Sequence, residues 1–269
     1  MAVVNSILKN VHGEPSAPDI GGGNVDYTKF IILTTARTGS SYLSSLLRSH
    51  NQIVSFHEIL HGLQFFSGYL KYPPIPIKKL NELRNDHPID LLEELIFRNY
   101  SDNIHAVGFK IFYDHANQGN LKNVWDYLRN MKNLKIIHLQ RSNLLESLVS
   151  LKLSMKTGQW FTTTKPKSNL WLRLDYDECL DYFKNISTNL DYFKRFFSKN
   201  EIKDIYYDEL LENTEKKLDE LQNFLGVDKK PMKTPLKKQT NQPLSDTILN
   251  YSELKRKFSS TKWAAFFED

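Results

Sequence analysis

The chain has 269 residues, of which 40% are hydrophobic and 25% are charged, and its formal net charge is +5. These values are ordinary for a folded globular protein and exclude a disordered or a collagen-like chain. A single cysteine, Cys179, excludes an intramolecular disulfide and a cysteine-rich zinc site, and a mean hydropathy of −0.48 without a long apolar run excludes a transmembrane helix.

The first 28 residues contain two prolines and the run Gly21-Gly22-Gly23, which predict a flexible lead-in to a single domain over residues 29–269. A glycine triplet can also cradle a phosphate, but no helix follows this one directly, so we favour the linker. The segment lacks a basic start, a long apolar stretch and a cleavage site, so we expect no signal peptide and a cytoplasmic location.

From residue 30 onwards, predicted strands alternate with predicted helices. Short apolar runs indicate strands buried on both faces, and apolar residues spaced by three and four indicate helix faces. The predicted strands are residues 30–33, 53–56, 105–112, 134–139 and 202–207. The predicted helices include residues 42–47, 91–96, 121–128, 144–155, 183–197 and 218–225, whereas the four prolines of residues 63–88 predict an irregular insertion. The pattern predicts an α/β fold, a P-loop-like parallel sheet flanked by helices on both faces.

The first predicted strand leads into Arg37-Thr38-Gly39-Ser40-Ser41, and Tyr42 follows in the predicted helix. Backbone N–H groups and the dipole at a helix N-terminus favour an anion there, and Arg37 adds a fixed positive charge. The motif G-x-x-x-x-G-K-[ST] is absent, which argues against ATP or GTP as a substrate. A serine-capped helix behind a surface arginine is the structural alternative.

A second cation, Arg141, comes directly after the strand at 134–139, and Ser150 lies nine residues beyond it. Because ligands bind at the carboxyl ends of parallel strands, we expect Arg37 and Arg141 at one rim of the sheet. Five lysines without an intervening acid follow at 229–238, either as a solvated charge run or as a further anion contact.

Several stretches together resemble the sulfotransferases that use 3′-phosphoadenosine 5′-phosphosulfate (PAPS), in particular the bacterial carbohydrate sulfotransferases related to the trehalose and nodulation-factor enzymes. The resemblance covers residues 29–269 outside the insertion. Its matching stretches are FIILTTARTGSSYLSSLLRSH, VSFHEIL, VGFKIF, KIIHLQRSNLLESLVSLKLSMKTGQW, IYYDELLENTEKKLDELQNFLGV and LKKQTNQPLSDTILNYSELKRKF.

The resemblance implies that the loop from Arg37 to Tyr42 binds the 5′-phosphosulfate of PAPS. It implies that Arg141 and Ser150 bind the 3′-phosphate. The usual spacing between this arginine and this serine is eight residues, whereas here it is nine, so Ser147 is the alternative to Ser150. Lys237 or Lys238 is expected to meet the same phosphate.

For the chemistry, the resemblance implies metal-free transfer of the sulfuryl group to a hydroxyl acceptor, releasing adenosine 3′,5′-bisphosphate. Glu58 matches the glutamate that bacterial carbohydrate members place after the second strand, so we assign it as the general base. Lys110 lies in an apolar strand, where a buried lysine needs an anion, and we assign it with Arg37 to the leaving phosphate. Phe112 stands where cytosolic members carry a histidine base. The alternative for Glu58 is an ordinary ion-paired glutamate. The alternative for Lys110 is a lysine paired with a structural acid.

On the acceptor side, the resemblance implies a carbohydrate or a glycolipid, and the aromatic residues of the 63–88 insertion are suited to stacking on a sugar. His57, His61 and His115 are expected to contact this substrate. We expect no nucleic acid partner and no stable membrane insertion, and the sequence predicts no oligomeric state.

Two other functions remain open. Residues His57 to His61 match the zinc-protease motif H-E-x-x-H, with Glu82 as a third ligand. That interpretation needs both histidines on one helix, whereas a predicted strand ends at Phe56 and Gly62 follows. A basic module that binds nucleic acid or acidic glycans is the second alternative, although a net charge of +5 is mild.

Overall fold

The computed structural model describes residues 25–61, 77–164, 170–238 and 240–268. In this part of the chain, five parallel strands form one sheet in the order β2-β3-β1-β4-β5. The strands are β1 Thr28–Thr34, β2 Ile53–Phe56, β3 Ala106–Phe112, β4 Lys135–Gln140 and β5 Glu201–Tyr206. Each predicted strand is therefore confirmed to within about two residues at each end.

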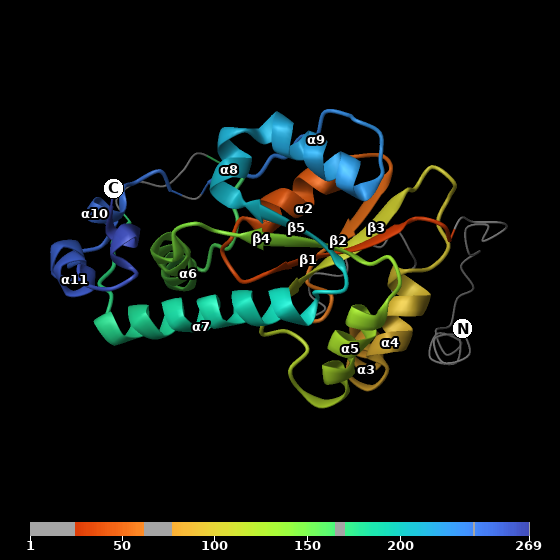
Figure 1. Cartoon of the computed structure of the whole chain (residues 1–269), viewed down its shortest axis with the longest axis horizontal. Coiled ribbons are helices and arrows are strands. Elements are labelled where there is room, and N and C mark those ends of the chain that lie inside the picture. Colours follow the sequence, from red (N-terminus) through yellow and green to blue (C-terminus); the bar gives the residue numbers. More distant parts are fainter. Residues whose placement is uncertain (1–24, 62–76, 165–169, 239, 269) are drawn as a thin grey trace.

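Helices cover both faces of the sheet (Figure 1), which confirms the predicted α/β class. One face carries α2 Ser40–Arg48, α8 Tyr207–Glu212 and α9 Thr214–Leu225. The other carries α3 Ile77–Asp86, α4 Pro88–Asp90, η2 Leu91–Ile96, α5 Asn123–Asn130 and α7 Tyr176–Phe196. Shorter 3-10 turns are η3 Gly119–Lys122 and η4 Ala264–Phe267.

The central strand β1 explains why both faces must be covered. Its side chains alternate, so Phe30 and Ile32 pack with α2 and α9 while Ile31 and Leu33 pack with α5 and α7. All four are buried. A strand that is apolar on both faces is stable only between two layers of helices.

A third cluster of buried side chains lies beyond the carboxyl ends of the strands, where Figure 1 shows the C-terminal helices. It is built from α6 Leu144–Thr157, the first half of α7, α10 Leu244–Thr247, α11 Tyr251–Phe258 and η4. Aromatic packing dominates it, with the ring of Phe183 against those of Phe258 and Trp263 at 5.6 Å each. The cluster places α6 and the segment before α10 opposite the strand ends.

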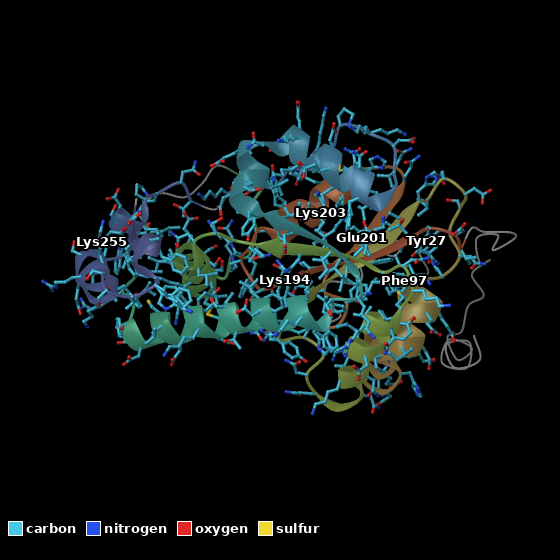
Figure 2. The ribbon with its side chains drawn as sticks, in the orientation of Figure 1. Tyr27, Phe97, Lys194, Glu201, Lys203 and Lys255 are labelled. Atoms are coloured by element: carbon cyan, nitrogen blue, oxygen red, sulfur yellow. The ribbon has the colours of Figure 1, made fainter. Side chains whose placement is uncertain are left out.

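The strand β5 closes one edge of the sheet, and charged side chains line it. Glu201 and Lys203, labelled in Figure 2, form ion pairs with Lys135 at 3.5 Å and with Glu220 at 3.1 Å. Charges on an edge strand discourage pairing with another chain.

The predicted irregular insertion is wrong for residues 77–88. Most of these residues form α3 and the start of α4, because Leu80 and Leu83 bury one face of α3 in the hydrophobic cluster on this side of the sheet. Pro88 does not break the helical segment, since it occupies the first turn of α4, where its missing N–H has no intrahelical partner. Residues 63–76 lie outside the described residues, as do residues 1–24, so the lead-in and its boundary stay predictions. None of the helices in the described ranges has both the length and the apolar character needed to cross a bilayer.

Candidate active site

The loop between β1 and α2 exposes backbone donors at one end of a cavity. Gly39 is the N-cap of α2, has a φ of +79°, and leaves the helix without a side-chain cap. A Cβ at this position would lie 2.1 Å from Cδ2 of Tyr207, so only glycine fits. The cavity is lined by Gly39, Ser40, Ser41 and Tyr42. The first-turn N–H groups, which have no intrahelical acceptor, are thus directed towards the cavity end.

The side chain of Thr38 does not reach this cavity. It is 2% exposed, and its hydroxyl lies 2.6 Å from the hydroxyl of Thr34 and donates to the carbonyl of Thr35 at 2.9 Å. Thr34 in turn donates to the carbonyl of Leu139 on β4 at 2.7 Å. Thr38 therefore fixes the loop to the sheet, and its predicted contact with phosphosulfate has no side-chain counterpart here.

Arg141 lies at the end of β4, next to the loop between β1 and α2 (the predicted phosphate loop), as expected because β4 and β1 are neighbours in the sheet. Its Nη1 donates to the carbonyl of Arg37 at 3.3 Å, its Nη2 pairs with the carboxylate of Glu146, and its guanidinium covers the ring of Tyr207 at 5.4 Å. Its Nε is buried and has no hydrogen-bond partner among the described residues. A buried guanidinium with an unused donor fits an anion.

The next helix, α6, begins with Asn143, whose side chain accepts from the N–H groups of Leu145 and Glu146. Asn143 therefore forms one half of a capping box with Glu146, the residue three positions beyond it. The reciprocal half is not formed, because the carboxylate of Glu146 turns to Arg141.

The guanidinium of Arg37 reaches α6 and the loop that follows it. Its Nε donates to the hydroxyl of Ser150 at 3.0 Å and its Nη1 to the carbonyl of Trp160 at 2.5 Å. Burial, together with repulsion from Arg141, lowers the pKa of Arg37 to about 10. Ser150 lines the cavity, whereas Ser147 is fully buried and does not, so the structure brings the first of these serines to the predicted 3′-phosphate site.

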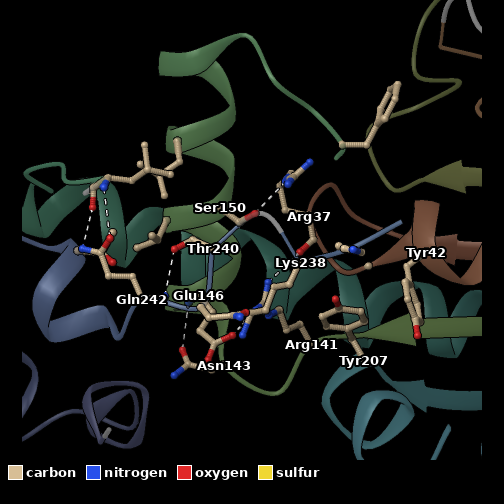
Figure 3. A pocket seen from close by; sticks show the side chains of 18 of the residues that line it. Arg37, Tyr42, Arg141, Asn143, Glu146, Ser150, Tyr207, Lys238, Thr240 and Gln242 are labelled. Atoms are coloured by element: carbon tan, nitrogen blue, oxygen red, sulfur yellow. Dashed lines mark hydrogen bonds and ion pairs between the residues drawn. The ribbon is translucent and has the colours of Figure 1, made fainter. Parts of the chain in front are cut away.

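These groups surround a cavity of about 470 Å³ (Figure 3). Residues 236–238 and 240–244 line it as well, and the N–H of Lys237 donates to the carbonyl of Thr162 at 2.9 Å. Of the basic run at 229–238, only Lys237 and Lys238 line the cavity. The earlier lysines lie on the surface, where Lys229 pairs with Asp219 at 3.1 Å.

Glu58 and Lys110 lie beside this cavity: Lys110 is on β3, and Glu58 comes two residues after the end of the neighbouring strand β2. Nζ of Lys110 contacts Oε1 of Glu58 at 2.8 Å and donates to the hydroxyl of Ser41 at 3.2 Å. Lys110 is 1% exposed, and burial outweighs the carboxylate of Glu58, so the pKa of Lys110 is lowered. The acid that partners Lys110 is thus the candidate base itself, and Ser41 connects the pair to the phosphate loop.

The three predicted acceptor histidines separate into two groups. Nε2 of His57 lies 2.9 Å from Nη1 of Arg48, whereas the rings of His61 and His115 stack at 4.8 Å. Burial lowers the pKa of His57 to about 3, helped by the charges of Lys110 and Arg48. Burial also lowers the pKa of His115 to about 3.

The zinc-protease interpretation does not match this geometry. Residues 57–61 form turns after β2 and not a helix, so the two histidines of the motif do not share a helical face. In the ranges that the structure describes, no three His, Cys, Asp or Glu side chains gather as a metal site.

Sequence reasoning missed Tyr207 and did not recognise Glu146 as a site residue. Both line the cavity. Tyr207 packs on Gly39 and meets the ring of Tyr42 edge-on at 6.1 Å. Arg37 and Arg141 were found because they follow strands. Tyr207 directly follows β5, so inspecting the end of that strand as well would have identified it.

Comparison with known proteins finds similar sequences and solved structures. The profile of the sulfotransferase family matches residues 30–231. Nodulation protein H of Rhizobium tropici is 30% identical over 249 residues, covering 89% of this chain and 92% of that protein. Nodulation protein H of Rhizobium meliloti is 28% identical over 246 residues, covering 89% of this chain and 94% of that protein. Among solved structures, a sulfotransferase from Alicyclobacillus acidocaldarius is 14% identical with a TM-score of 0.49. The match covers 86% of this chain and 91% of that one.

Proposed function

This chain belongs to the sulfotransferase family and is an enzyme of sulfuryl transfer, and on that premise we propose that PAPS is its donor and a hydroxyl group of a carbohydrate or glycolipid its acceptor. The observation that carries the donor assignment is the cavity with cationic groups from two neighbouring strand ends. Its volume of about 470 Å³ is within the usual range for a site that binds a small ligand.

The hydrogen-bond donors and cations of the cavity fit a nucleotide that carries anionic groups at both the 3′ and the 5′ position. We assign the 5′-phosphosulfate to the backbone from Gly39 to Tyr42, where first-turn N–H groups are uncapped. We assign the 3′-phosphate to Arg141, whose buried Nε has no partner among the described residues, together with Ser150 and Lys237 or Lys238, which line the same cavity. Arg37 joins the two subsites, because it precedes the first in the same loop and its guanidinium reaches Ser150.

The proposed chemistry is an in-line displacement at sulfur. Glu58 accepts the proton of the acceptor hydroxyl, whose oxygen forms the new bond to sulfur as the bond from sulfur to the 5′-phosphate oxygen breaks. Once Glu58 is protonated, Lys110 loses its counter-ion at 2.8 Å, and its positive charge then acts on the leaving phosphate. The positive charge of Arg37 also acts on the leaving phosphate. The second product is adenosine 3′,5′-bisphosphate.

The acceptor assignment rests on the resemblance to carbohydrate sulfotransferases and on the rim of the cavity. Trp160 and Phe161 line the cavity and are 49% and 60% exposed. Exposed aromatic rings at the mouth of a site stack well on the apolar faces of sugar rings. The histidines His57, His61 and His115 stay proposed acceptor contacts.

The test is a comparison of ligands by isothermal titration calorimetry, followed by an assay of radiolabelled sulfuryl transfer. We expect the protein to bind adenosine 3′,5′-bisphosphate more tightly than adenosine 5′-monophosphate or ATP, and to pass label from PAPS to an oligosaccharide with a chelator present. Equal affinity for the three nucleotides would refute the donor assignment. Proteolysis that is lost on chelation would support the zinc alternative, and salt-sensitive DNA binding without PAPS affinity the binding module.

A further inference from the structure

The 3′-phosphate subsite already contains an anion of the protein itself. The carboxylate of Glu146 pairs with Nη2 of Arg141, the cation that we assign to the 3′-phosphate. The arginine side chain is 7% exposed and the glutamate side chain 32%, and both line the cavity. The carboxylate is therefore the more exposed partner and the guanidinium the more buried one; both residues are labelled in Figure 3.

The place of Arg141 does not depend on this carboxylate. Its Nη1 donates to the carbonyl of Arg37 at 3.3 Å, and its guanidinium lies on the ring of Tyr207 at 5.4 Å. Both contacts come from segments that the sheet fixes, at the ends of β1 and β5. Glu146, in contrast, has its backbone N–H bonded to the side chain of Asn143, and its own side chain lines the cavity from the first turn of α6.

We propose that Glu146 is an internal competitor for the 3′-phosphate, a carboxylate that occupies Arg141 until the nucleotide displaces it. The inference rests on the proposed function, because it needs a 3′-phosphorylated nucleotide at Arg141. Two anions at one guanidinium repel each other, so part of the nucleotide's binding free energy is spent in moving Glu146 aside. The carboxylate returns as the product adenosine 3′,5′-bisphosphate leaves, which speeds release of a ligand that would otherwise be held by several cations.

The test is Glu146→Gln, which keeps the shape of the side chain and removes its charge. We expect about a tenfold lower Kd for adenosine 3′,5′-bisphosphate and a correspondingly slower dissociation in stopped-flow measurements. Adenosine 5′-monophosphate lacks the 3′-phosphate, so its affinity should not change. The matched control is Glu209→Gln, which breaks an exposed pair with Lys217 away from the cavity and makes the same change in net charge. Glu146→Ala serves as a second variant, and thermal unfolding checks that each variant is folded.

The outcomes are distinct. Weaker binding of the bisphosphate in both Glu146 variants would mean that Glu146 positions Arg141, which overturns the proposal. An equal gain for both nucleotides, or the same gain in the Glu209 control, would mean a general charge effect and also overturns it. If the wild-type protein shows no preference for the 3′-phosphorylated nucleotide, the proposed function itself fails. That result is visible before any variant is made.

Discussion

Gly39 offers a sharp test of how the phosphate loop is built. It has a φ of +79°, and a Cβ there would lie 2.1 Å from Cδ2 and 2.3 Å from Cε2 of Tyr207. Gly119 is a matched control, because its φ of +53° is also left-handed but a Cβ there would meet nothing within 4 Å. The substitutions Gly39→Ala and Gly119→Ala therefore share the backbone strain and differ in the collision with the ring.

The expected magnitudes follow from these two terms. A left-handed alanine costs about 1–2 kcal/mol, and this is the whole effect predicted for Gly119→Ala. Forcing a methyl group into an occupied space adds about 1–3 kcal/mol, so Gly39→Ala should lower the free energy of unfolding by roughly 2–5 kcal/mol. Because the ring of Tyr207 also lies 5.4 Å from the guanidinium of Arg141, displacing the ring should weaken nucleotide binding as well.

The assay is urea unfolding of both variants, repeated in a Tyr207→Ala background. Removing the ring creates space for the Cβ, so the cost of Gly39→Ala should fall by about 1–3 kcal/mol in that background, while the cost of Gly119→Ala should stay the same. Calorimetry with adenosine 3′,5′-bisphosphate supplies a second measure, in which only the Gly39 variant should lose affinity.

The reasoning would be refuted if Gly39→Ala cost no more than Gly119→Ala. It would also be refuted if the cost of Gly39→Ala were equal with and without the ring of Tyr207. Either result would mean that the ring does not close on the loop as described.

Three further predictions concern the chemistry and the pH dependence. Glu58→Gln should lower turnover by about 10²–10⁴-fold while the Kd for adenosine 3′,5′-bisphosphate stays near its wild-type value, and a normal rate in initial-velocity assays would remove this carboxylate from the mechanism. Arg141→Ala should weaken the bisphosphate but not adenosine 5′-monophosphate in calorimetry, and equal losses for both would contradict the 3′-phosphate assignment. Burial lowers the pKa of His57 and of His115 from 6.5 to about 3, so the unfolded chain binds more protons than the fold between these values. Stability should therefore fall as the pH drops from 6.5 towards 3, by at most about 1.4 kcal/mol per pH unit for each histidine, and urea unfolding at several pH values should show a shallower slope for His115→Gln.

Much of the fold could be predicted because its signals are local. The three inner strands contain short apolar runs, and each long helix carries apolar residues at spacings of three and four, so burial on the observed faces follows from the order of residues. The same locality explains the failure at residues 77–88. Four prolines suggested an irregular segment, and nothing in the order of residues shows that Leu80 and Leu83 would find a surface to cover.

The candidate site was predictable in its members but not in its contacts. Arg37 and Arg141 follow strands, so a parallel sheet must bring them to one rim whatever their side chains do next. Three contacts join residues more than 60 positions apart, and no pattern along the chain encodes their distances: Lys110 with Ser41, Arg37 with Ser150, and Tyr207 with Gly39.

The sequence by itself determined the α/β class and the rim of the sheet at which Arg37 and Arg141 lie, because these depend on periodicity and on which residues follow strands. Only the tertiary structure decided that Glu58 is the partner of Lys110, that Ser150 and not Ser147 lines the cavity, and that Glu146 occupies Arg141. Those outcomes depend on the directions of side chains from separate helices and strands. Shifts of a few ångströms in the distances between these elements would change which charged groups come into contact.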